Sequence, residues 1–187
     1  VAQNSTNGVV ITDAEACIEW LNGAFTAMTG YELAEVKGRK PGHFLQGPQT
    51  DPAAVARLRE AVARGEACRV ELLNYAKDGS AFWQIVDMQP VRERSGRIIN
   101  FISNHTNVTG QRNDQSRLQH LNQRFELAAR AAALGVWEWD LVTQRSVWDE
   151  RTLQIYGLRA DEFSGSLEDW KRCLHPQDRV AAIAQIQ

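Results

Sequence analysis

The alternation of hydrophobic and polar residues divides the first part of the chain into strands placed before and after a helical middle. The β-branched run "GVVITD" (8–13) and the alternating segment "CIEWLN" (17–22) predict two short strands joined by a turn. Three longer strands are predicted over residues 69–76, 81–92 and 97–107, separated by the turn sequences "KDGS" and "ERSG". Two early strands and a later three-strand meander together predict a five-stranded antiparallel sheet.

Between the two groups of strands, glycines and capping residues predict several helices. Asn22 is placed to cap a short helix that stops at Gly30, and a second short helix follows in "YELAEVKG". The stretch "GRKPGHFLQG" (38–47) is rich in Gly and Pro, so we expect a loop there. A longer helix is predicted to begin at Pro52, with Thr50 or Asp51 as its cap. It should bury one face, because apolar residues recur three and four positions apart. Residues 1–109 are therefore expected to form one α+β domain with the helices on one face of the sheet.

The composition changes after this domain. Residues 110–134 contain no Pro and only the initial Gly, and an apolar seam recurs at spacings of three and four: Leu118, Leu121, Phe125, Ala128 and Ala132. This spacing favours a coiled coil and hence a homodimer, although two heptads fit equally well a single amphipathic helix packed on its own domain. Over residues 135–187 the opening strand–turn–strand–helix pattern recurs and stops before its long strands. We expect this segment to be the first part of a second, truncated domain of the same type.

Charge and composition exclude several classes of function. The 187 residues are 43% hydrophobic and 24% charged with a net charge of −2, so nothing indicates a nucleic-acid surface or membrane contact. No apolar run is long enough to span a membrane, and no signal-peptide pattern is present.

The first residue is Val, so we expect the sequence to be an excerpt of a longer chain. The three distant cysteines favour neither disulfides nor a metal site and suit a reducing cytoplasm. No nucleophile–base pair or phosphate loop is recognisable, and we expect no enzymatic activity in these residues.

Three motifs in register carry a resemblance to a known family: "GRKPGHFLQGPQTD", "LLNYAKDGSAFWQ" and "QPVRERSGRIINFISNHTNVT". Over Gly8–Thr109 the chain resembles a PAS domain, and within that superfamily its LOV (light, oxygen, voltage) branch. Residues 125–187 are similar to the PAS repeats of bacterial sensor proteins. The resemblance implies the PAS fold: a five-stranded antiparallel sheet with helices on one face, followed by a connecting helix and a truncated second PAS domain.

LOV domains hold a flavin non-covalently, and a cysteine in "GRNCRFLQG" adds to the flavin after blue light. Counting back from "FLQG", that position is Gly42 here. Because the addition requires a thiol, the resemblance implies a flavin site without this photochemistry.

The resemblance also assigns the groups that would hold the flavin. The amides and the last-strand glutamine that bond the polar edge of the ring correspond to Asn74, Gln84 and His105. Gln46 corresponds to a residue that contacts the ribityl chain. The two phosphate-binding arginines correspond to His43 and Arg59, and the weakened clamp at His43 leaves FAD as well as FMN open.

Two function hypotheses follow. One is the sensory input region of a signal-transduction protein, in which a flavin reports redox state, or light without thiol chemistry, through the linker helix to a downstream output domain. The alternative is a ligand-free tandem PAS module that serves only in dimerisation. A different ligand also remains open, with haem the poorest fit because the helix after the loop offers no axial histidine. Trp83, beside Gln84, is a candidate electron donor to the flavin.

Overall fold

The computed structural model describes residues 6–184 and divides the chain into two compact units, residues 1–115 and 116–187. The first unit contains β1 (Gly8–Asp13), β2 (Ile18–Leu21), α1 (Gly23–Thr29), α2 (Leu33–Val36), α3 (Gly42–Leu45), α4 (Pro52–Arg64), β3 (Cys68–Tyr75), β4 (Ala81–Arg92) and β5 (Ile98–Asn107). Helix α5 (Thr109–Ala131) begins in this unit.

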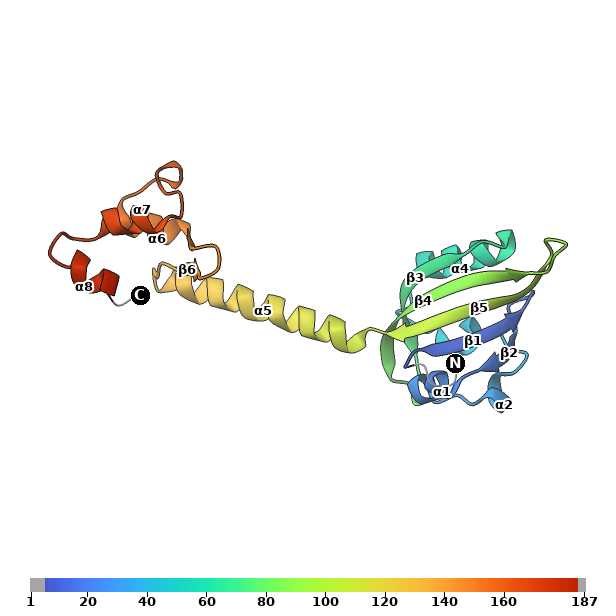
Figure 1. Ribbon diagram of the computed structural model, residues 1–187. Coiled ribbons are helices and arrows are strands. Elements are labelled where there is room, and N and C mark those ends of the chain that lie inside the picture. Colours follow the sequence, from blue (N-terminus) through green and yellow to red (C-terminus); the bar gives the residue numbers. More distant parts are fainter. Residues whose placement is uncertain (1–5, 185–187) are drawn as a thin grey trace. The chain divides into compact units, whose positions relative to one another are not determined.

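The sheet of the first unit has the strand order β2-β1-β5-β4-β3, and every neighbouring pair is antiparallel. Figure 1 shows this order from β2 at one edge to β3 at the other. The central strand β5 therefore lies between the first strand of the chain and the two strands that precede it in sequence. The predicted fold class, a five-stranded antiparallel sheet with helices, is confirmed.

The helices begin and end where their capping residues predict. The Asn22 side chain accepts a hydrogen bond from the Phe25 N–H at 3.0 Å, which satisfies a donor at the start of α1. Asp51 caps α4 by accepting from Ala53 N–H at 2.9 Å, and Gly65 ends that helix in the left-handed region at φ 65°. One detail differs from the expectation: the stretch 38–47 is not entirely loop, because Gly42–Leu45 forms the single turn α3.

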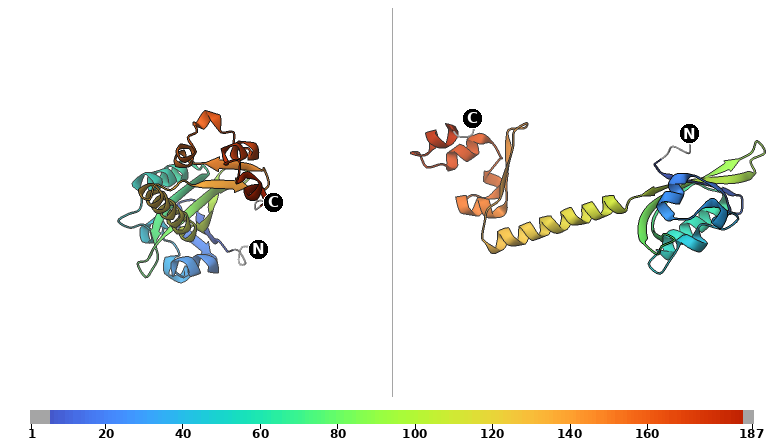
Figure 2. Two further views of the ribbon diagram at one scale, coloured as in Figure 1. Left: turned by 90° about the vertical axis from the view of Figure 1, so that its left-hand side faces the viewer. Right: turned by 90° about the horizontal axis from the view of Figure 1, so that it is seen from below.

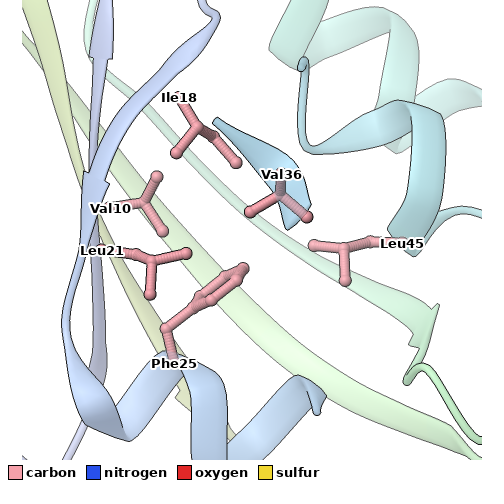
Figure 3. Packing of buried hydrophobic residues seen from close by; sticks show 6 residues of the cluster. All are labelled: Val10, Ile18, Leu21, Phe25, Val36 and Leu45. Carbon is pink, nitrogen blue, oxygen red and sulfur yellow. The ribbon is translucent and has the colours of Figure 1, made fainter. Parts of the chain in front are cut away.

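The hydrophobic core lies between one face of the sheet and the helices. One cluster of buried side chains comes from β1, β2 and the three short helices and is shown in Figure 3: Val10, Ile18, Leu21, Phe25, Val36 and Leu45. Helix α4 packs against β3, β4 and β5 through Ala54 and Ala61. These two parts of the core leave a cavity between them, and that cavity contains the candidate site.

The second unit is smaller. After the remainder of α5 it contains β6 (Trp137–Asp140), β7 (Arg145–Trp148), α6 (Glu150–Tyr156), a 3-10 turn η2 (Ala160–Glu162), α7 (Leu167–Cys173) and α8 (Arg179–Ala184). β6 and β7 pair as an antiparallel hairpin, coloured orange in Figure 2. Trp148 stacks on Phe163 at 4.1 Å between ring centroids and also contacts Tyr156. The hairpin has no further strand among the described residues. That this unit is a truncated second domain stays a prediction.

None of the described helices combines the length and the apolar character needed to cross a membrane.

Candidate ligand pocket

A cavity of about 500 Å³ lies inside the first unit, between the inner face of the sheet and helices α3 and α4. Its size falls within the range of small-molecule sites, roughly 300–1,000 Å³. The period of two along each strand explains its lining, because side chains two positions apart point to the same face. β3 contributes Leu72 and Asn74; β4 and β5 contribute Gln84, Val86, Met88, Phe101, Ser103 and His105.

All seven residues assigned from the resemblance lie in the lining of this one cavity. They come from distant parts of the sequence: Gly42, His43, Gln46, Arg59, Asn74, Gln84 and His105. The tertiary structure therefore brings the predicted site residues together, while their contacts with a ligand stay predictions.

The deep end of the cavity is polar and closed to solvent. Asn74, Gln84 and His105 are each at most 3% exposed. His105 Nδ1 lies 3.1 Å from Gln84 Oε1, and its Nε2 lies 2.9 Å from Ser103 Oγ. Phe25 meets the imidazole edge-on at 5.2 Å between ring centroids. Burial lowers the pKa of His105 from 6.5 to about 4, because a buried charge is costly, so the ring is neutral at pH 7.

The middle of the cavity is apolar and its mouth is cationic. Aliphatic and aromatic side chains line the middle: Leu45, Val55, Leu58, Val62, Leu72, Val86, Met88 and Phe101. Lys40, His43 and Arg59 are exposed members of the lining and therefore mark its mouth, and the described lining contains no Asp or Glu. Such a site suits a long ligand with a flat apolar body, a hydrogen-bonding edge and an anionic tail.

Residue 42 leaves room for a neighbouring side chain. A Cβ added to Gly42 would lie 2.7 Å from Gln46 Nε2, so the Gln46 amide occupies the space that a larger residue would need. No cysteine occurs in the described lining. Cys68 instead packs beside the core at the start of β3, and Cys17 precedes β2, where its N–H bonds Asp13 at 2.7 Å.

Trp83 does not border the cavity, so the expectation that it lies beside a ligand there is wrong. It alternates with Gln84 along β4 and points to the opposite face, where the Arg112 guanidinium lies 3.7 Å from its ring centroid. The alternation of side chains along a strand would have predicted this position.

Sequence reasoning also missed Lys40, Ser103 and Thr12 as lining residues. The alternation along β5 places Ser103 on the same face as His105, but nothing local marked Lys40.

Comparisons with known proteins match parts of both units to PAS sequences. The PAS domain model matches residues 6–110, and a PAS fold model matches residues 145–187. A blue-light-activated histidine kinase of Brucella ovis is 31% identical over 159 residues, which are 78% of this chain and 32% of that protein. Phototropin-2 of Oryza sativa is 42% identical over 103 residues, which cover 54% of this chain and 11% of that protein. The chain thus spans about a third or less of the length of these relatives.

Solved structures of LOV domains share the fold. The LOV domain of a blue-light-activated histidine kinase from Erythrobacter litoralis EL346 matches with a TM-score of 0.53 and 30% identity, covering 57% of this chain and 99% of that one. A LOV domain studied with a flavin analogue matches with a TM-score of 0.56 and 35% identity, covering 65% and 91%.

Proposed function

Because the chain belongs to the PAS domain family, we propose that its first unit is the LOV-type sensory input domain of a signal-transduction protein and binds a flavin non-covalently. The observation that carries the proposal is the cavity itself. It has a buried edge of Asn74, Gln84 and His105, an apolar middle and a cationic mouth. The relatives named above are light-activated kinases and a phototropin, which supports sensing as the role.

The residues fit a flavin at each part of that molecule. The amides and imidazole can donate to and accept from the polar edge of the ring system. The apolar middle excludes water from the ring, and Arg59 and Lys40 offer charges to a phosphate at the mouth. A flavin supplies the capacity to take up electrons and protons, and the buried side chains would respond through their hydrogen bonds. FMN and FAD both suit a mouth of this kind.

We propose redox state as the stimulus, or light without thiol chemistry. The reason is Gly42, which supplies no nucleophile at the position where LOV domains carry their cysteine, and the lack of a cysteine in the described cavity lining.

A route from the pocket to α5 supports transmission through that helix. Gln84 points into the cavity, and the backbone of the adjacent Trp83 bonds the residues at the start of the helix. The Trp83 N–H donates to Thr109 Oγ1 at 2.8 Å, and the Trp83 carbonyl accepts from the Val108 N–H at 2.9 Å. Arg112 stacks on Trp83 and pairs with Glu71. A shift of β4 would therefore move the first turn of α5.

The experiment is spectroscopic. Protein purified in the dark is scanned for flavin absorption, then mixed with FMN and with FAD, and titrated with a reductant under anaerobic conditions. Asn74→Ala and His105→Ala should weaken flavin binding, while Asn104→Ala, on the outer face between two lining residues of β5, serves as the matched control. A colourless protein that takes up neither flavin would refute the proposal.

The second candidate is a ligand-free module whose role is dimerisation through α5. The observation that favours it is the exposed apolar seam: Leu118 is 62%, Leu121 50% and Phe125 59% exposed. This dimer is also compatible with flavin sensing. Leu121→Asp tests the seam, with Gln123→Asp on the opposite side of the helix as its control. If the pocket variants leave output intact and only Leu121→Asp abolishes it, the module hypothesis replaces the sensor.

The output activity is expected in a downstream domain of the same polypeptide. A histidine kinase is the natural proposal, since this chain aligns with 32% of the Brucella protein. We expect no catalytic activity in the present residues, and we propose a cytoplasmic location.

A further inference from the structure

Four buried polar side chains form one continuous hydrogen-bonded chain at the deep end of the cavity. Asn74 on β3 contacts Gln84 on β4, Gln84 contacts His105 on β5, and His105 contacts Ser103 two positions earlier on β5. Their exposed fractions are 3%, 0%, 3% and 8%. Buried groups of this kind are satisfied only when each donor meets an acceptor, so the chain must have a direction.

The direction is set at Asn74. Its amide lies against two main-chain carbonyls, 3.3 Å from Leu45 O and 3.1 Å from Leu73 O. Carbonyl oxygens only accept hydrogen bonds, so the amide nitrogen Nδ2 must face both of them. The oxygen Oδ1 then faces Gln84 and accepts from its Nε2. The opposite orientation would place oxygen against two oxygens and nitrogen against nitrogen.

This orientation propagates to the histidine. Because Gln84 turns Nε2 toward Asn74, its Oε1 faces His105 and can only accept, so the proton of the neutral imidazole sits on Nδ1. Nε2 is left as an acceptor, and the Ser103 hydroxyl donates to it. The hydroxyl is a rotor that can donate or accept, so it follows the direction of the chain and does not set it. One N–H of Gln84 Nε2 then has no acceptor among the described residues, and this side chain borders the cavity.

We propose that Asn74 is the specificity-determining residue of this pocket: anchored on the Leu45 and Leu73 carbonyls, it holds His105 as the Nδ1–H tautomer and leaves Gln84 with an N–H directed to the ligand. The deep end therefore selects a heteroaromatic edge that accepts a hydrogen bond at that point. If the ligand edge carries a hydrogen at that point, its own donor faces the Gln84 N–H, and no hydrogen bond can form. Turning Gln84 round to accept from it would set Gln84 Oε1 against Asn74 Oδ1, and Asn74 could follow only by giving up both carbonyl anchors.

The tautomer is measurable without any ligand. The full chain, labelled with ¹⁵N-histidine, is observed at pH 7 by long-range ¹H–¹⁵N correlation, and the His105 signals are identified by their loss in His105→Gln. We expect a protonated Nδ1 and an unprotonated Nε2, the reverse of the form that neutral imidazole prefers in water. In Asn74→Ala the anchor is lost, and the Nε2–H form should become the major one. If Asn74→Ala does not fold, Gln84→Leu cuts the same chain one residue further on.

Two further variants separate the anchor from its neighbours. Ser103→Ala should keep the Nδ1–H form, because the direction is set at the other end, and Asn104→Ala on the outer face should change nothing. A wild-type Nε2–H form would overturn the proposal. So would an Nδ1–H form that persists in the Asn74 or Gln84 variant, or a tautomer that changes in Ser103→Ala alone.

A second experiment tests the selection of the ligand edge, and it rests on the proposed flavin function. Binding of oxidised and of reduced FMN is compared under anaerobic conditions, and we expect oxidised FMN to bind about tenfold more tightly, the ratio given by one neutral hydrogen bond of about 1.4 kcal/mol. Equal or tighter binding of reduced FMN would contradict the selection of an accepting edge. If neither form binds, the proposed flavin function fails, while the tautomer still decides the role of Asn74.

Discussion

The buried imidazole of His105 should make the first unit sensitive to acid, and His105→Gln should remove that sensitivity. Burial lowers the pKa of His105 from 6.5 to about 4 in the folded protein, whereas the unfolded chain keeps the ordinary value. As the pH falls below 6.5, the unfolded state takes up the proton first. The stability associated with the neutral ring is therefore fully present above pH 6.5 and is lost as the pH falls through 4.

The size of the effect follows from the shift. A difference of 2.5 pKa units at 1.36 kcal/mol per unit gives about 3 kcal/mol of unfolding free energy lost between pH 7 and pH 4. Glutamine has no charge to acquire and can still donate and accept toward Gln84 and Ser103. Carboxylates that titrate in the same range act equally in both proteins, so they cancel in the difference.

The assay is urea unfolding of the ligand-free full chain at pH 7, 6, 5 and 4, followed by NMR signals of amides in β4 and β5. These amides report the first unit alone. Subtracting the wild-type curve from the His105→Gln curve should give a difference that grows toward acid, with Asn104→Ala as a control that runs parallel to wild type. Two curves that stay parallel within about 0.5 kcal/mol, the usual effect of a surface substitution, would refute the reasoning.

Three other outcomes are expected. Gly42→Cys should create a blue-light-dependent thiol–flavin bond if the proposed flavin is present, seen as reversible loss of the flavin absorption. The Cβ of this cysteine would lie 2.7 Å from Gln46 Nε2. Gly42→Cys combined with Gln46→Ala should therefore react more completely. Gly47→Ala should destabilise the first unit by about 1–3 kcal/mol in the same urea assay, because the new methyl group would overlap the Tyr75 ring. Leu121→Asp should lower the apparent mass in light scattering, whereas Gln123→Asp should not, and a monomeric wild type would contradict the seam.

Much of the first unit was determined by the sequence itself. β1 occupies the residues predicted for it, and the caps Asn22 and Asp51 start α1 and α4, because strand alternation and helix capping depend on neighbours within a few residues. The resemblance also named seven residues that prove to line one cavity. The turn α3 was missed, since a single turn between Pro41 and Gln46 has too few residues for a periodic signal.

Only the tertiary structure decided how these residues act on one another. Strand pairing placed Asn74, Gln84 and His105 within hydrogen-bonding reach, and the Leu45 carbonyl, contributed by the turn that sequence patterns missed, helps to set their direction. The fold also placed Arg112 of α5 on the Trp83 ring, a contact that the alternation along β4 does not predict. A sequence states which side chains can donate or accept. Which of them meet, and in which order, depends on the register of strands that are distant in the chain, and only the folded backbone fixes it.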